Sequence, residues 1–386
     1  MTDLAKGGLE WPTYRHDAAR SGRSVTAVPA ELKQKWTARI GKNLTAPVIA
    51  RGKLIAADKD THRVFALNAE SGKPVWSFVA GGRVDSPPTI HRGRVLFGCR
   101  DGFAYCLDAG SGALVWRYRA APAIRSLVAS EQIESLWPLH GSVLVLEDRL
   151  YCVAGRNMFL DGGMRFVCLD VDTGRLVSET VLGGVDPTTK KDLQFKMRNR
   201  SLPVALPDIL SSDGKSIFMK SQKFTLDGRR PTVDPSRNAG DQTGPDAHLF
   251  APGGFLDSTG FHRVCMLYGK VFTGGAGSNH AAQRAAPSGK MLVFDDSRVY
   301  GFSRLPHLHR WVRSLEFHIF AADKYNRRAM PPRRRRRAKA ETKKQPPPSA
   351  GNMIVHMAGD NAKKRQRVIG SLVGTRVKYE WSSHDP

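Results

Sequence analysis

The sequence predicts an all-β protein, a β-propeller of four-stranded blades. Residues 64–76 return in related form as residues 104–116, 40 positions further on, and residues 166–177 form a third copy. Each copy is a short apolar run followed by a turn that contains glycine. Short strands repeated about every 40 residues are typical of propeller blades, because one blade cannot bury both of its faces without neighbours.

Each copy also carries residues that would let neighbouring blades pack. Glycine at the turn avoids the clash that a Cβ atom would cause there. A tryptophan that closes the copy can wedge between two blades, where an aromatic side chain buries about 150–250 Å². In the third copy Ser178 takes the place of the tryptophan. The expected docking residues are Trp36, Trp76, Trp116, Gly72, Gly112 and Gly174.

Four regions follow one another along the chain. Residues 1–31 form an N-terminal segment with little periodicity, and residues 32–326 form the propeller. Residues 327–351 are rich in arginine, lysine and proline, and we expect a disordered linker because like charges repel and cannot pack. Residues 352–386 are expected to form a partial terminal blade. Within the third blade, residues 121–131 are an insertion that we expect to be a loop or short helix.

The net charge of +25 predicts attraction to polyanions such as nucleic acid, acidic polysaccharide or anionic lipid. Residues Arg327 to Lys344 hold ten Lys or Arg and one Glu, which contributes +9 of that total. A basic surface with no such partner is the alternative. No stretch approaches the ~18 apolar residues of a membrane span, and residues 1–8 lack the apolar core of a signal peptide.

The five cysteines cannot all pair with one another. Cys106 and Cys168 occupy the same place in two copies, on an apolar strand, so we expect small core side chains. Counting along the hairpin places Cys152 roughly opposite Cys168, which allows a disulfide in an oxidising compartment. The sequence holds no CxxC motif, which argues against a zinc ribbon or covalent haem.

The repeat resembles the pyrroloquinoline quinone (PQQ)-like β-propeller repeat, whose hallmark is Ala-x-Asp-x-x-Thr-Gly-x-x-x-Trp. Residues 11–22 also resemble the start of such proteins, and segments 82–89, 134–141, 156–163 and 248–252 resemble a bacterial subgroup of exported propellers. The hallmark positions are Ala66, Asn68, Ser71, Gly72 and Trp76 in the first copy and Asp108, Ser111, Gly112 and Trp116 in the second.

The resemblance covers most of residues 10–325 and implies about eight blades. Since only about six or seven can be counted before the linker, we expect an incomplete ring and a shortened gene product. The resemblance implies the periplasm or cell envelope, whereas a genuine start without a leader would imply the cytoplasm.

Quinoprotein dehydrogenases with this fold hold PQQ over the propeller axis with a carboxylate base, calcium ligands, a stacking tryptophan and often two adjacent cysteines. This sequence has no adjacent cysteines, and its carboxylates Asp85, Glu134, Asp161 and Asp170 lie in separate repeats. Calcium prefers six to eight oxygen ligands. We therefore expect no catalytic residues, no metal and no cofactor, and keep a PQQ- and calcium-dependent oxidoreductase as the alternative.

Polar residues that interrupt the repeat form the candidate ligand site, because propeller loops gather at one end of the axis. Arginines beside carboxylates can bind a polar or anionic ligand, and ion pairing between blades is the alternative. We expect a non-catalytic scaffold that binds proteins or a ligand on the propeller face; a polyanion binder acting through the basic linker is a second alternative. The candidates are Arg83, Asp85, Arg125, Glu134, Trp137, His140, Arg156, Asp161 and Gly162.

Overall fold

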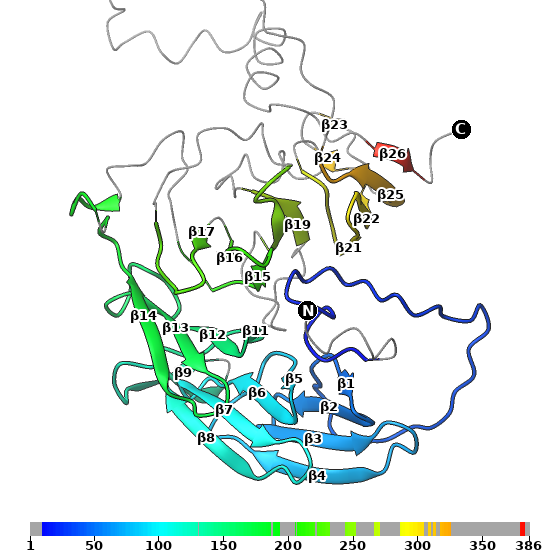
Figure 1. Ribbon diagram of the computed structural model, residues 1–386, viewed down its shortest axis with the longest axis horizontal. Coiled ribbons are helices and arrows are strands. Elements are labelled where there is room, and N and C mark those ends of the chain that lie inside the picture. The colour runs from blue at the N-terminus through cyan, green and yellow to red at the C-terminus, as the bar shows by residue number, and fades with distance from the viewer. Residues whose placement is uncertain are drawn as a thin grey trace, which may run out of the picture.

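The computed structural model is all-β, and the described residues contain no α-helix, which confirms the predicted fold class (Figure 1). It describes residues 10–129, 131–186, 188–193, 205, 207–220, 222–231, 244–251, 266–270, 286–304, 308–309, 312–313, 317–325 and 379–382. Six antiparallel sheets of three or four strands follow one another around a common centre. The sheets do not close into a ring: the first and the last stand apart in Figure 1.

The first three sheets each have four strands in chain order. They are β1 (Val48–Ala50), β2 (Lys53–Asp58), β3 (Arg63–Asn68) and β4 (Pro74–Val79); β5 (Thr89–His91), β6 (Arg94–Gly98), β7 (Phe103–Asp108) and β8 (Leu114–Arg119); and β11 (Leu144–Leu146), β12 (Arg149–Ala154), β13 (Met164–Asp170) and β14 (Leu176–Leu182).

The next two sheets have three strands each, and the last has four. They are β15 (Leu210–Ser212), β16 (Ile217–Met219) and β17 (Gln222–Phe224); β18 (His248–Phe250), β19 (Met266–Gly269) and β20 (Ser288–Gly289); and β21 (Met291–Phe294), β22 (Arg298–Arg304), β25 (Phe317–Asp323) and β26 (Tyr379–Ser382). Two further hairpins are β9 (Ser126–Ala129) with β10 (Gln132–Ser135), and β23 (Leu308–His309) with β24 (Val312–Arg313).

The hallmark motif is a turn that joins the third and fourth strands of a sheet. The third strand ends in a β-bulge at the same place in the first three sheets, between Ala66 and Leu67 in the first. The carboxylate of Asp108 then accepts hydrogen bonds from the backbone N–H groups of Gly110 and Ser111 at 3.0 and 2.9 Å. These bonds, those of Ser111 above all, lower the pKa of Asp108. An Asp or Asn is therefore required here to build the turn.

The tryptophans dock on the glycine turn of the next sheet. Trp76 donates from Nε1 to the backbone oxygen of Ala109 at 3.0 Å, and its ring lies over Gly112. Trp36 and Trp116 repeat this contact on Ala69 and Val171. Where Ser178 replaces the tryptophan, Gly228 of the next sheet covers its hydroxyl oxygen.

Replacing Gly112 with alanine tests this docking. A Cβ atom there would lie 2.6 Å from Trp76 Cδ2, and the backbone φ of +74° disfavours any side chain. We expect G112A to lower the free energy of unfolding by about 2 kcal/mol, measured by urea denaturation. Gly52 is the matched control, because its φ is +72° but nothing lies within 4 Å of the added atom. G52A should lower the free energy of unfolding by only about 1 kcal/mol, because it strains the backbone without any side-chain clash. Equal losses would contradict the docking role.

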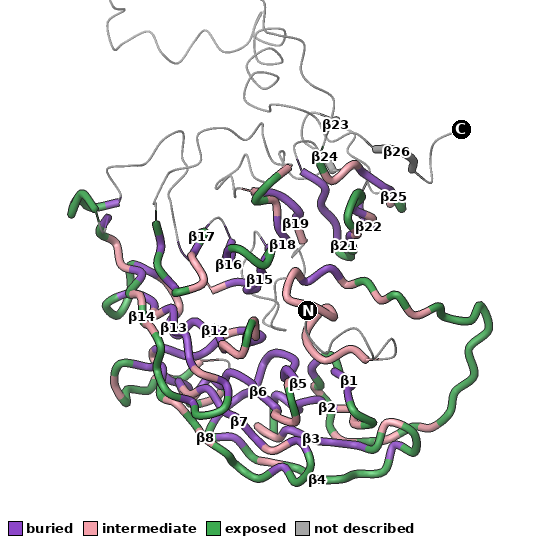
Figure 2. Tube along the Cα trace, in the orientation of Figure 1, coloured by how far each residue is buried: buried purple, intermediate pink, exposed green. Residues whose placement is uncertain are grey.

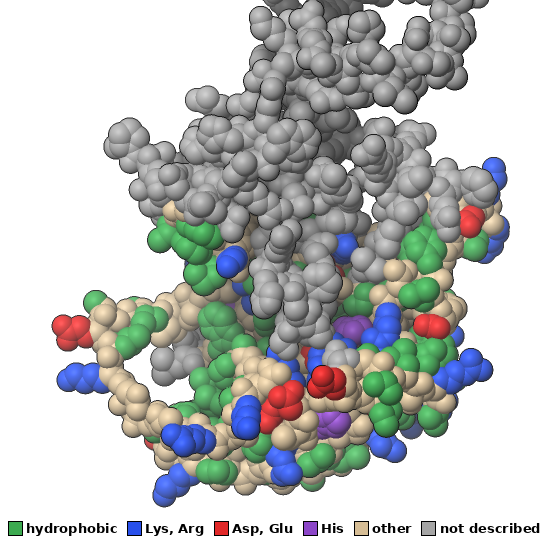
Figure 3. All heavy atoms as spheres, turned by 180° about the vertical axis from the view of Figure 1, so that it is seen from behind, with side chains coloured by type: hydrophobic (Ala, Val, Ile, Leu, Met, Phe, Trp, Pro, Cys, Tyr) green, Lys and Arg blue, Asp and Glu red, His purple; other side chains and the backbone are tan. Residues whose placement is uncertain are grey.

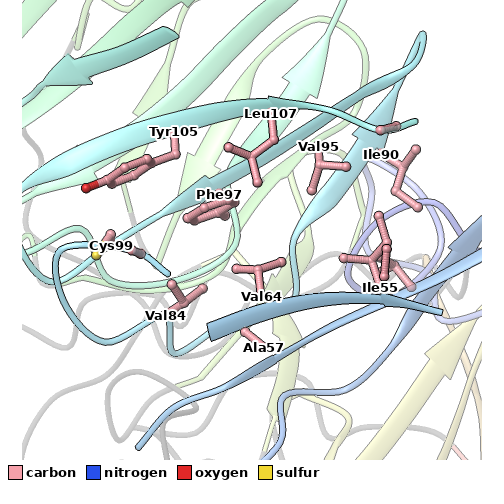
Figure 4. Close-up of a cluster of buried hydrophobic side chains, with 14 of the residues drawn as sticks. Ile55, Ala57, Val64, Val84, Ile90, Val95, Phe97, Cys99, Tyr105 and Leu107 are labelled. Carbon is pink, nitrogen blue, oxygen red and sulfur yellow. The ribbon is translucent and has the colours of Figure 1, made fainter. Parts of the chain in front are cut away.

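The core lies between neighbouring sheets. Figure 4 shows Ile55 and Val64 of the first sheet facing Val95, Phe97 and other side chains of the second. The Phe97 ring stacks on Tyr105, with 5.2 Å between centroids. Figure 2 shows that burial is concentrated on the inner strands and that β4 and β8 are largely exposed. Each sheet thus depends on its neighbours for stability.

The disulfide that the sequence allowed between Cys152 and Cys168 is absent. Tyr151, not Cys152, pairs with Cys168 across β12 and β13, and Cys152 pairs with Val167. Because successive side chains of a strand point to opposite faces, the two sulfurs lie on opposite sides of the sheet. Cys99, Cys106, Cys152 and Cys168 are all buried and free, which confirms the prediction of core side chains for Cys106 and Cys168; Cys265 lies outside the described residues.

The insertion is also different from the expectation. Residues 126–135 form the β9–β10 hairpin where a loop or short helix was expected at 121–131. Ser130 lies outside the described residues, and Glu131 has a φ of +63° in this connection. A two-residue connection of this kind suits a tight hairpin.

Residues 11–22, which we name the hub segment, fill the centre of the sheets. The N–H of Trp11 donates to the oxygen of Ile49 in β1 at 2.7 Å, and Ile90 in β5 donates to Pro12 at 2.7 Å. Ser212 in β15 donates to Ala18, and Phe294 in β21 donates to Ser21. The N-terminal segment, which shows no repeat, is thus integral to the fold.

Two arginines of the hub segment complete these contacts. The Arg20 guanidinium, fully buried, donates to the backbone oxygens of Val143 at 3.0 Å and Leu210 at 2.9 Å. Arg15 donates to the Leu292 oxygen and to Met266 Sδ. The hub segment therefore contacts all six sheets, and Figure 1 shows the described N-terminal end near the centre.

The predicted linker 327–351 and most of residues 352–386 lie outside the described residues. Tyr379–Ser382 forms β26, which pairs with β25 as the outer strand of the sixth sheet. Among the described residues there is no helix long and apolar enough to cross a membrane. In the view of Figure 3, Lys and Arg side chains are spread among apolar ones over the described surface.

Candidate functional site

Polar side chains of the second and third sheets meet at the end where the second strand of each sheet turns into the third. Arg100 and Arg156 each follow such a second strand, β6 and β12, by two residues. Other members come from segments that precede the first strands β5 and β11. We name the arginine cluster the group Arg83, Asp85, Arg100, Glu134, His140 and Arg156.

Ion pairs run through the arginine cluster without a break. Arg83 Nε lies 2.6 Å from Asp85 Oδ1, and Arg100 Nε donates to the other oxygen of Asp85. Arg100 also donates from one Nη to both oxygens of Glu134, at 2.7 and 3.0 Å. Arg156 reaches Glu134 Oε2 at 2.8 Å. Charge-assisted hydrogen bonds of this kind fix side-chain geometry strongly.

The arginine cluster gathers three guanidinium groups and two carboxylates in a largely buried place. The Glu134 side chain is 0% exposed and that of Arg100 4%, whereas the Arg156 side chain is 23% exposed. Burying charge costs several kcal/mol per ion unless it is paired. The site can therefore accept an anion on the side of Arg156.

The buried atoms His140 Nδ1 and Arg156 Nε have no hydrogen-bond partner among the described residues. The pKa of His140 lies well below its ordinary value, first because of burial and then because of Arg100, Arg156 and Arg83. His140 is therefore neutral at pH 7. An anion bound here would meet a guanidinium N–H and an imidazole that can donate in one tautomer.

Four of the nine predicted residues belong to the arginine cluster through contacts, and a fifth, His140, through electrostatics. Arg125 is exposed and takes no part. Trp137 is buried in the core and donates from Nε1 to the backbone oxygen of Asp161 at 2.9 Å. Asp161 and Gly162 themselves form an exposed turn with φ values of +54° and +78°. Trp137, Asp161 and Gly162 thus make local structural contacts and do not join the arginine cluster.

Sequence reasoning missed Arg100, which links the two carboxylates. A usable signal was present, because a basic residue recurs just after the second strand at Lys59, Arg100, Arg156, Lys220 and Lys270.

A second buried carboxylate lies in the fourth sheet. Asp208 Oδ1 accepts hydrogen bonds from the N–H groups of Ile209 at 2.7 Å and Ala251 at 3.1 Å. Burial raises the pKa of Asp208 to about 7, although those bonds and the charge of Lys220 act in the opposite direction. Burial likewise lowers the pKa of Lys220. This carboxyl titrates near neutral pH.

Stability should therefore depend on Asp208 between pH 5 and 8. Because its pKa is raised from 3.8 to about 7 on folding, its stabilising contribution is present below pH 3.8 and is lost as pH rises through 7. We expect D208N, which does not titrate, to gain about 2 kcal/mol relative to the wild type between pH 5 and pH 8 in urea denaturation. D213N, at an exposed turn, is the control. A constant difference between D208N and the wild type would contradict this prediction.

The described residues do not suit a PQQ and calcium site. They contain no group of three or more His, Cys, Asp or Glu that could hold a metal ion. Both carboxylates of the arginine cluster are engaged by arginines, and the hub segment occupies the centre of the sheets. No chemical step is therefore derived through that cofactor.

Comparison with known families gives one match. The family described as outer membrane protein assembly factor BamB, a PQQ-like repeat family, matches residues 18–205. The matched range begins inside the hub segment and includes the arginine cluster.

Two curated proteins match shorter regions. A DNA damage-responsive serine/threonine-protein kinase, RqkA, of Deinococcus radiodurans is 29% identical over 125 residues, which are 30% of this chain and 18% of the kinase. The outer membrane protein assembly factor BamB of Burkholderia pseudomallei is 32% identical over 102 residues, 26% of each chain. The chain thus matches about a quarter or less of these relatives' own length.

Solved structures with a similar fold include BamB from Moraxella catarrhalis, at 18% identity and a TM-score of 0.39, covering 66% of this chain and 67% of that chain. A quinohemoprotein alcohol dehydrogenase from Pseudomonas putida HK5 is 12% identical with a TM-score of 0.44, covering 83% and 58%.

Proposed function

Because residues 18–205 place this chain in the PQQ-like β-propeller repeat family, we propose that it is a non-catalytic binding scaffold of the bacterial cell envelope. The arginine cluster is its ligand site, and the ligand is a carboxylate of a partner protein or small molecule. The relatives described as outer membrane protein assembly factors support protein partners and an envelope location.

One observation carries this proposal: Arg156 Nε and His140 Nδ1 are buried and have no hydrogen-bond partner among the residues described. A purely structural ion-pair network would satisfy its buried polar atoms. A bound carboxylate would supply the missing acceptor. The alternative of pure inter-blade ion pairing leaves both unexplained.

Titration calorimetry with citrate, a simple carboxylate probe, tests this function. We expect saturable binding that R156A weakens at least tenfold, because the most accessible guanidinium is lost. R149A is the matched control, since Arg149 forms a comparable ion pair with Asp170 at 3.2 Å on the outer part of the third sheet. No binding, or equal weakening by R149A, would overturn the proposal.

The same protein should be titrated with PQQ and calcium while tryptophan fluorescence and dye-linked alcohol oxidation are followed. Saturable quenching together with turnover would establish a quinoprotein oxidoreductase in place of a scaffold.

Polyanion binding through Arg327–Lys344 is a separate proposal that lies outside the described residues. Deletion of residues 327–351 would abolish such binding and leave citrate binding intact.

A further inference from the structure

Strand β10 has its polarity reversed. A surface hairpin normally turns its apolar side chains inward and its polar ones to water. Here Gln132 and Glu134 of β10 face the sheets: Gln132 Oε1 lies 2.9 Å from His62 Nε2, and Glu134 belongs to the arginine cluster. Val128 and Ile133, which pair directly across the hairpin, point the other way.

The outward side of the hairpin is apolar and open. Val128 is 76% exposed and Ile133 71%, and Ile124 just before β9 is 80% exposed. Exposed apolar residues at the outer strands of the sheets are less open, such as Val79 at 55% and Val181 at 50%. Three such side chains gathered on one hairpin indicate a contact surface.

The hairpin also offers a strand edge. Among the described residues β9 pairs only with β10, so its other edge has no strand partner. On the opposite side, the N–H of Ser135 donates to the Arg100 oxygen at 2.8 Å, which fixes β10 to the second sheet. A rigidly held hairpin with one open edge can accept an extended peptide by strand addition.

We propose that the β9–β10 hairpin docks an extended segment of a partner protein in which apolar residues alternate with acidic ones. The apolar residues cover Val128 and Ile133, and an acidic side chain reaches the arginine cluster through Arg156. Charge supports this occupant: the chain carries +25, and Arg125 beside β9 is exposed. The same charge disfavours a second copy. This inference rests on the proposed function and names the partner's chemistry.

Fluorescence anisotropy of the full chain with a labelled eight-residue peptide that alternates glutamate and valine tests the inference. We expect the double variant V128S/I133S to raise the Kd at least tenfold while citrate binding stays unchanged. The control is V79S/V181S, which removes exposed apolar surface from other sheets and should leave the Kd within twofold. A peptide that alternates lysine and valine should bind at least tenfold more weakly.

Three results would overturn the inference. The first is that V128S/I133S binds the peptide as tightly as the wild type does. The second is that V79S/V181S weakens binding as much as V128S/I133S. The third is that analytical ultracentrifugation shows a wild-type dimer that V128S/I133S abolishes, because the hairpin is then covered by a second copy of the chain. Failure of the proposed function gives a different result, since citrate binding would then be insensitive to R156A. Far-UV circular dichroism of each variant establishes that it is folded.

Discussion

Replacement of Arg20 with alanine is expected to lower the free energy of unfolding by about 3–5 kcal/mol, the largest effect of any single change outside the arginine cluster. The Arg20 side chain is fully buried, and burial lowers the pKa of its guanidinium to about 10, so it stays charged at neutral pH. No described carboxylate forms an ion pair with it. Its partners are the oxygens of Thr13, Tyr14, Val143 and Leu210, at 2.8 to 3.0 Å.

Loss of Arg20 would leave these acceptors without donors in a dry interior and would remove the side-chain hydrogen bonds from the hub segment to the third and fourth sheets. Lysine cannot replace it, because one ammonium group cannot match the planar fork that reaches four oxygens in different directions. Urea denaturation of R20A and R20K, followed by tryptophan fluorescence, measures both effects.

Arg23 is the matched control for Arg20. It lies three residues away, is exposed, and makes only a long ion pair of 3.8 Å with Asp296. R23A is expected to change the free energy of unfolding by less than about 0.5 kcal/mol. If R20A and R23A behaved alike, the hub segment would not hold the sheets together.

Replacement of Glu134 with glutamine should have two effects of opposite sign. Stability is expected to fall by about 3–5 kcal/mol, because Arg100 and Arg156 lose their shared buried counter-charge. Citrate binding is expected to tighten several-fold, because loss of one carboxylate makes the arginine cluster more positive and releases Arg156. Urea denaturation and titration calorimetry of the same preparation measure the two quantities.

Glu131 provides the control for Glu134, since it lies on the same hairpin three residues earlier but is exposed. E131Q should alter neither stability nor citrate binding by more than about 0.5 kcal/mol. Weaker citrate binding in E134Q would contradict an anion site, because it would make Glu134 itself part of the ligand contact.

Several parts of the candidate site could be predicted from the sequence, because polar residues that interrupt a repeat are not needed for its strands. Asp85, Glu134 and Arg156 stand out in this way. Arg100 does not, because it is two residues from Gly102 in an ordinary turn. Its role depends on Glu134, 34 residues away, and no local pattern predicts that pairing.

The polarity of the β9–β10 hairpin shows the same limit. Residues 124–134 mix apolar and polar side chains without strict alternation, so the sequence pattern does not say which side faces inward. Binding of Glu134 to Arg100 and of Gln132 to His62 decides it. Without those contacts, the apolar side would be expected to turn toward the core.

The sequence by itself determined the blades. The β-bulge, the turn built by Asp or Asn, the turn glycine and the docking tryptophan all make their contacts within one repeat or with the next repeat. A repeat of about 40 residues is therefore long enough to specify them. Only the tertiary structure decided that the hub segment fills the centre of the sheets, that Cys152 and Cys168 lie on opposite faces of their sheet, and which charged residues form the arginine cluster. Residues 11–22 follow no repeat, and their partners in all six sheets are brought together by the ring-like arrangement alone. Contacts between residues that far apart in the chain depend on the packing of every sheet between them.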